Sequence, residues 1–198
     1  MKKALNKNLS EQELACSFNI VLDKEIRERI RKIQNDLVEK FSEKRFYDSS
    51  PHAAICTKFM GISKTKDFVE VIQKEFKNDK IWELELSTFV PSDQGTYIFL
   101  NFSKKSVDKI FELNKRAIES TKGIGFEVQH GEDKPKYPYF PHISIIKLED
   151  HEVTEAINLI RDDLNGLKMP VRKYEIMVQK DNKKGFAHFP TIREINLQ

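Results

Sequence analysis

Two short stretches place a histidine in strand-like sequence, and their residue types could support chemistry. The first runs from Tyr137 to Leu148 (YPYFPHISIIKL), where aromatic and proline residues lead into β-branched apolar residues. Strand side chains alternate between two faces, so His142 and Ser144 are predicted to share one face while the isoleucines beside them share the other. A polar pair on an apolar strand costs stability unless it is hydrogen-bonded or lines a wet groove. His142 and Ser144 are therefore site candidates.

A similar stretch lies upstream, where Ser50 to Phe59 (SPHAAICTKF) again places a proline before a histidine and an apolar run after it. His52 and His142 stand 90 positions apart, so only the folded chain can bring them together. The two copies differ at one position, because Ala54 stands where Ser144 stands in the other. The nearby hydroxyl of Thr57 is predicted to face the opposite side unless a bulge turns it.

The composition predicts a soluble protein with a substantial hydrophobic core. The chain has 198 residues, of which 39% are hydrophobic and 33% charged, and this fits one domain or two small lobes. No run approaches the ~18 apolar residues of a membrane span, and the first residues show no secretory signal, so we expect a cytoplasmic protein. Cys16 and Cys56 lie in apolar runs and are expected to be buried free thiols. A net charge of +3 is too small for a protein that coats nucleic acid.

Strands and helices are expected to alternate around the two histidines. Strands are predicted over 16–22, 52–59, 81–90, 96–102, the stretch after His142, 169–180 and 186–197, and helices over 24–41, 65–76, 107–118 and 149–164. Asp23 and either Ser103 or Ser106 are expected to cap helices, and 123–138 to form a long loop. Residues 1–13 are expected to be flexible. Each half holds one Pro-His strand, so we predict a single bilobal domain over 1–198, with lobes of roughly 14–94 and 95–198 that can exchange strands.

These residues resemble the signature of the 2H phosphoesterase superfamily, which includes the 2′-5′ RNA ligase-like proteins and cyclic nucleotide phosphodiesterases. That signature is two His-x-Thr/Ser motifs, each on a strand, about this far apart on a chain of about this size. The run from Pro141 to Ile145 (PHISI) matches it, whereas Pro51 to Ile55 (PHAAI) matches at the histidine and the apolar frame but not at the hydroxyl position. The similarity extends over roughly 15–197 and includes the closing pattern of a long strand, a Lys-Gly turn and a last strand.

The resemblance implies an α+β fold of two antiparallel sheets, with helices on the outside and a central groove that holds both histidines. It also implies cleavage of a phosphodiester without a metal or cofactor, on RNA ends, 2′-5′ linked oligonucleotides or 2′,3′-cyclic phosphates. The implied partner is an RNA, oligonucleotide or cyclic nucleotide substrate, with no membrane, and we expect a monomer.

Two histidines suit this chemistry because one can take a proton from the attacking oxygen while the other gives one to the leaving oxygen. Histidine titrates near pH ~6.5, so one ring can be neutral and the other protonated at neutral pH. The two oxygens lie on opposite sides of phosphorus, so the two rings must come from opposite walls. We predict His52 and His142 as the catalytic pair and Ser144 as a hydrogen-bond donor to the phosphate. The sequence does not say which histidine is the acid.

Further residues near the motifs are candidates for contacts with the substrate. Tyr137, Tyr139 and Phe140 offer aromatic surface on which a base could stack. Lys58 and Lys147 offer ammonium groups for a phosphate. The alternatives are a hydrophobic plug between the lobes for the aromatic residues and a solvated surface position for each lysine.

Ala54 leaves the activity itself open. Loss of one donor to a phosphoryl oxygen costs ~10²–10³ in rate. The sequence therefore fits a slow enzyme, an enzyme with an altered substrate, or a catalytically weakened module that binds nucleotide or RNA. A third class, an interaction domain whose groove binds a peptide, remains an alternative because single buried histidines are often structural.

Overall fold

The computed structural model describes residues 13–41, 51–92, 95–127, 139–178 and 190–198. The strands are β1 (Glu13–Val21), β2 (His52–Gly61), β3 (Trp82–Pro91), β4 (Tyr97–Phe102), β5 (Phe126–Glu127), β6 (Ile143–Lys147), β7 (Lys168–Val171), β8 (Lys173–Val178) and β9 (Thr191–Asn196). The helices are α1 (Lys24–Phe41), α2 (Thr65–Phe76), α3 (Lys104–Ser120) and α4 (Asp150–Ile160), with a 3₁₀ turn over Ile62–Lys64.

The strands form two antiparallel sheets, as predicted for an α+β fold. The first sheet has the order β5-β2-β1-β8-β9 and the second the order β6-β4-β3-β7. Each sheet takes strands from both halves of the chain: β3 from the first half joins the second sheet, and β8 and β9 from the second half join the first. The two histidine stretches thus lie in different sheets, β2 in one and β6 in the other.

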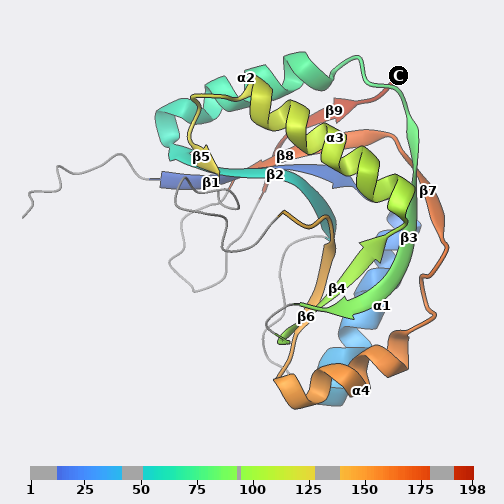
Figure 1. Ribbon diagram of the computed structural model, residues 1–198. Helices are drawn as coiled ribbons and strands as arrows, with labels where there is room; N and C mark the ends of the chain where they lie inside the picture. The colour runs from blue at the N-terminus through green and yellow to red at the C-terminus, as the bar shows by residue number, and fades with distance from the viewer. Residues whose placement is uncertain (1–12, 42–50, 93–94, 128–138, 179–189) are drawn as a thin grey trace, which may run out of the picture.

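Helices α1 and α3 begin where capping side chains predict. Asp23 Oδ1 accepts a hydrogen bond from the backbone N–H of Ile26 at 2.9 Å, and Ser103 caps α3 through the N–H of Ser106. Glu149 and Glu152 form a reciprocal capping box at the start of α4. Figure 1 shows α2 and α3 together along the first sheet, while α1 and α4 lie beside the second. Helices cover the outside of the sheets, as expected.

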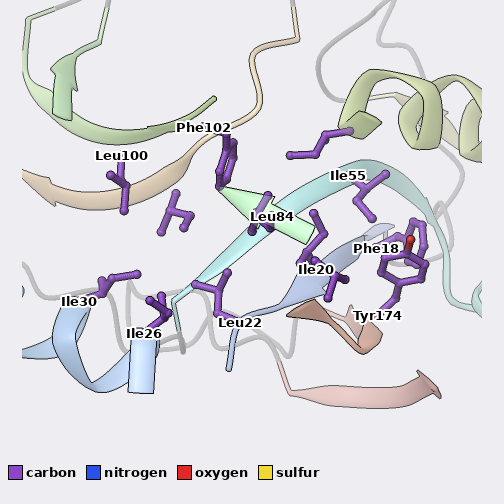
Figure 2. Packing of buried hydrophobic residues seen from close by; sticks show 14 of the residues in the cluster. Phe18, Ile20, Leu22, Ile26, Ile30, Ile55, Leu84, Leu100, Phe102 and Tyr174 are labelled. Atoms are coloured by element: carbon purple, nitrogen blue, oxygen red, sulfur yellow. The ribbon is translucent and has the colours of Figure 1, made fainter. Parts of the chain in front are cut away.

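The apolar faces of both sheets and the inner faces of the helices make one continuous core. Figure 2 shows Phe18 and Ile20 of β1, and Leu22 just after it, in one cluster with buried residues from β3, β4 and β8. Cys16 and Cys56 belong to this core as buried free thiols, which confirms the prediction. Burial of this apolar surface is the main force that holds the two sheets together.

Three local predictions were wrong. The strand predicted over 169–180 is divided at Arg172, where the chain leaves the second sheet as β7 and enters the first as β8. The alternation over 81–90 predicts that Thr88 faces the same side as Leu84 and Leu86. Thr88 is instead exposed, because an irregularity in the pairing of β3 with β4 turns Phe89 inward in its place. The predicted loop over 123–138 contains the short strand β5, which pairs with β2.

Across the described helices, none is both long and apolar enough to cross a membrane.

Candidate active site

His142 directly precedes β6, and contacts on two sides fix its ring. Its Nδ1–H donates to the backbone carbonyl of Phe140 at 2.7 Å. The Phe99 ring of β4 stacks on the imidazole with 3.9 Å between the ring centroids and 28° between the planes. Because Nδ1 keeps its proton in that hydrogen bond, Nε2 is the nitrogen that gains or loses a proton near neutral pH.

The surroundings of His142 favour its neutral form. Burial lowers the pKa of His142, since the charged ring loses hydration; the hydrogen bond to Phe140 opposes this shift and the charge of His52 adds to it. Strands β2 and β6 are in contact, so the two histidine stretches adjoin although they belong to different sheets.

A β-bulge determines which side chains of β6 share a side with His142. The pairing of β6 with β4 skips Ile145, and a skipped residue shifts the alternation of the strand by one. Ile145 and Ile146 are consequently both buried, whereas His142, Ser144 and Lys147 are all half-buried. We call the side of β6 and β4 that carries these three residues the second histidine face.

An equivalent bulge occurs in β2. Its pairing with β1 skips Ile55, so Ile55 and Cys56 are both buried while His52, Ala54 and Thr57 are half-buried. We call the side of β2 and β1 that carries these three residues the first histidine face. Thr57 shares this side with His52, the outcome that the sequence allowed only if a bulge intervened.

Polar groups flank Ala54 on the first histidine face. The Thr57 hydroxyl lies 3.1 Å from Ser17 Oγ, and Ser17 Oγ donates to Asn19 Oδ1 at 2.6 Å. Ser17 and Asn19 are buried, and Asn19 lies directly opposite Ala54 in the pairing of β1 with β2. With the Ser17 proton given to Asn19, Thr57 donates the hydrogen between the two hydroxyls and keeps its lone pairs as acceptors.

An aromatic row extends from His142 across the second histidine face. The rings of Tyr97 and Phe99 stack with centroids 6.1 Å apart, and the Phe140 ring stacks on His142 at 6.1 Å. Lys147 Nζ lies 5.4 Å from the centroid of the Tyr97 ring. Phe140 is 43% exposed, so one end of this row is accessible to a ligand.

Sequence reasoning missed the part of this row that β4 supplies. In Thr96–Phe102 (TYIFLNF) the odd-numbered positions Tyr97, Phe99 and Asn101 are half-buried, and the residues between them are buried. This alternation was visible in the sequence, but nothing local connects β4 to a histidine 43 positions beyond Phe99. Asn101 Oδ1 is buried and has no hydrogen-bond partner within the described part of the chain.

Two predicted substrate contacts lie elsewhere. Lys58 is 3% exposed, and its ammonium donates to the carbonyls of Thr121 and Ile124 at 2.8 and 3.2 Å, so the prediction that it meets phosphate was wrong. The bulge in β2 is the reason, because it turns Lys58 toward the end of α3. Tyr139 is also buried, and its hydroxyl donates to the carbonyl of Ala54 at 2.7 Å, which fits the plug and not a stacking surface. Tyr137 lies outside the described residues.

The described residues contain no group of three or more histidine, cysteine or carboxylate side chains placed to hold a metal ion. The ionisable groups on the two histidine faces include the two imidazoles and the Lys147 ammonium. Such a set can exchange protons and attract an anion.

Comparison with known proteins identifies the fold. No protein-family model and no curated protein matches the sequence. Three solved structures are similar to the chain: E. coli LigT complexed with 3′-AMP (14% identity, 94% of this chain and 99% of that one, TM-score 0.67); the Thermus thermophilus protein TT0787 (12%, 92% and 97%, 0.66); and Kluyveromyces marxianus Usb1 (11%, 93% and 99%, 0.52). A further similar structure is described as a phosphoesterase, with 15% identity and a TM-score of 0.59. The chain therefore has the fold of LigT and of the other solved proteins named here, in agreement with the fold that the resemblance of its two Pro-His stretches implies.

Proposed function

We propose that this protein is a phosphodiesterase that cleaves a phosphodiester in RNA or a small nucleotide, with His52 and His142 as its acid–base pair. The observation that supports this most directly is the placement of the two histidines at equivalent positions of two adjoining strands from different sheets. The fold agrees, because its structural neighbours are 2H phosphoesterases. E. coli LigT has been solved with 3′-AMP, ATP, NADP⁺ and phosphate, all of which are phosphate-bearing ligands.

The surroundings of the two rings suggest their roles. The pKa of His142 is lowered, so His142 is the base that accepts the proton of the attacking oxygen at Nε2. His52, on the opposite strand, then gives a proton to the leaving oxygen. In the reverse direction of the same step the two roles exchange, since the group that received a proton must return it.

Side chains on both histidine faces can hold the rest of the substrate. Ser144 donates to a non-bridging phosphoryl oxygen, and Lys147 balances the charge that develops there. Phe140 and the row behind it offer a surface for a nucleobase. Thr57 uses its proton in the hydrogen bond to Ser17 and has lone pairs left to accept, so it suits a sugar hydroxyl better than a phosphoryl oxygen. This set favours a 2′,3′-cyclic nucleotide or a 2′-5′ linked dinucleotide as substrate.

Purified protein incubated with 2′,3′-cyclic nucleotides and 2′-5′ linked diadenylate in EDTA tests the proposal. We expect cleavage, and we expect His52→Ala and His142→Ala each to reduce kcat by roughly 10²–10⁴. His151→Ala is the matched control, because His151 is exposed on α4 and should leave the rate unchanged. Full activity in either catalytic variant would refute the proposed pair.

The second candidate function is a module that binds nucleotide without cleaving it. Ala54 favours it, because the donor expected at that position is absent. Equilibrium binding of the same nucleotides by a protein that shows no turnover over long incubation would select this function. If neither cleavage nor binding is seen, both candidates fail.

A further inference from the structure

The backbone carbonyls at the two bulges are hydrogen-bonded by buried amide side chains. Gln34 Nε2 of α1 donates to the carbonyl of Ile145 at 2.8 Å, and Asn114 Nδ2 of α3 donates to the carbonyl of Ile55 at 2.6 Å. Gln34 is 3% exposed and Asn114 is 7% exposed. A bulged residue is left unpaired and disrupts its ladder locally, and a buried carbonyl without a partner is costly, so each amide stabilises a bulge.

The two amides occupy equivalent places. Gln34 comes eleven residues after the capping Asp23, and Asn114 comes eleven residues after the capping Ser103. Each bulged isoleucine stands three residues after its histidine. The orientation of Gln34 is fixed as well, because Arg31 donates to its Oε1 at 3.3 Å and leaves the nitrogen end for Ile145. The same device thus appears once for each histidine.

The bulges decide which residues share a side with the histidines. In a regular strand, the residue five positions after the histidine would face the opposite side, because side chains alternate. With one residue skipped, Thr57 returns to the side of His52 and Lys147 to the side of His142. We propose that Gln34 and Asn114 are positioning residues, which hold the bulges and thereby keep Thr57 and Lys147 at the active site.

The arrangement is also crossed between the sheets. α1 follows β1 of the first sheet, yet its amide holds β6 of the second; α3 follows β4 of the second sheet, yet its amide holds β2 of the first. Each histidine strand is therefore fixed by a helix that enters from the other sheet. This makes the position of one histidine relative to the other depend on both amides.

Replacement of each amide by a carboxyl gives a test that depends on pH. In Gln34→Glu and Asn114→Asp, the buried carboxyl can donate to the isoleucine carbonyl when protonated but repels it when ionised, and burial raises its pKa. In Gln34→Glu the neighbouring Arg31 guanidinium opposes this rise, so its transition should come at lower pH than that of Asn114→Asp. This expectation rests on the proposed function: kcat of both variants should fall roughly 10–100-fold below that of wild type as pH rises through the pKa of the new carboxyl. It should recover in acid, where the carboxyl is protonated. Ile72→Ala in α2 is the control: it loses a buried side chain and lowers the melting temperature, but should keep the wild-type pH profile.

A second readout does not need catalysis. In imidazole NMR titrations of the folded protein, Gln34→Leu should change the titration of His142 more than that of His52, whereas Asn114→Leu should change that of His52 more. Unchanged titrations in both folded variants, together with wild-type pH profiles for the carboxyl variants, would overturn the positioning role. If the wild-type protein is inactive but the titrations of the two leucine variants change in this crossed pattern, the proposed function is refuted and the positioning role of the amides stands.

Discussion

At the scale of single residues, the neutral state of His142 links the site to stability. Its pKa in the folded protein lies below the ordinary value of 6.5, mainly because of burial. Between these two pKa values the unfolded chain binds more protons than the folded one, so stability must fall as pH falls through this window and level off below it. The site therefore has a stability cost in acid.

We expect His142→Gln to remove part of that acid-side loss. Urea denaturation of wild type and variant from pH 8 down to pH 5 should give free energies of unfolding that decline less steeply for the variant below about pH 6.5. The exposed His151→Gln is the control and should follow the wild-type curve. Parallel curves for wild type and His142→Gln would mean that His142 is not held neutral by burial.

Ala54 permits a gain-of-function experiment. Its side chain shares a side with His52 and lies opposite Asn19, so Ala54→Thr places a hydroxyl where Ser144 places one on the other face. We expect the turnover of a 2′,3′-cyclic nucleotide to rise roughly 10-fold or more, because one oxyanion donor is worth ~10²–10³. Ala54→Val has the same shape without the hydroxyl and should give no gain. If both substitutions have the same effect, the hydroxyl at position 54 does not act as the absent donor.

The residue types at the site were predictable only in part. His52, His142 and Ser144 follow from a motif whose spacing within each strand is local. Lys58 was assigned wrongly because its direction depends on a bulge, and a bulge depends on a buried amide that lies 59 positions away from Ile55. Tyr97 and Phe99 were missed because they lie beside His142 only through the pairing of β4 with β6, and a single sequence does not specify strand pairing.

At the scale of elements, Lys58 joins β2 to the end of α3. Its buried ammonium donates to the carbonyls of Thr121 and Ile124, and the Thr121 carbonyl also accepts from the Ile124 N–H. We expect Lys58→Met to remove the ammonium donor from both carbonyls and to leave that of Ile124 unsatisfied. The predicted loss is about 1–3 kcal/mol in the free energy of unfolding, measured by chemical denaturation. Lys66→Met is the control, because Lys66 forms an exposed pair with Glu70 and should change stability by less than about 0.5 kcal/mol. If Lys58→Met loses activity while its stability is unchanged, Lys58 contacts the substrate and does not serve a structural role.

Most elements were predictable because their signals are local. Hydrophobic spacing and the caps at Asp23 and Ser103 located the helices, and β-branched runs located the strands. The division at Arg172 was not predictable, because both β7 and β8 are strand-like in sequence and only the choice of sheet separates them. Local sequence indicates that a segment is extended but not which neighbour it pairs with.

At the scale of the whole molecule, the crossed helices and exchanged strands make the two halves dependent on each other. Fragments 1–94 and 95–198 each lack strands that their sheets need, β8 and β9 in the first case and β3 in the second. We expect each fragment alone to be unfolded by near-UV circular dichroism, and a mixture of the two to regain signal. A natively folded single fragment would contradict this interdependence.

The resemblance carried by the Pro-His stretches implies two antiparallel sheets, which the structure has, but it does not say which strands belong to each sheet. A division at residue 94 separates the chain into two halves of similar length. The strands of each sheet come from both halves, because long-range pairing depends on the common core. The sequence thus predicted the number of sheets and the fold class, and left the membership of each sheet open.

The burial of Cys16 and Cys56 gives the chain an internal reporter of its own opening. Burial raises the pKa of the Cys16 thiol, and both sulfur atoms lie within the core of the first sheet. Since the thiolate is the reactive form, an alkylating reagent can modify these sites only when the sheet separates from its helices. The rate of labelling in unmodified protein therefore measures how often the folded state opens, with no engineered probe.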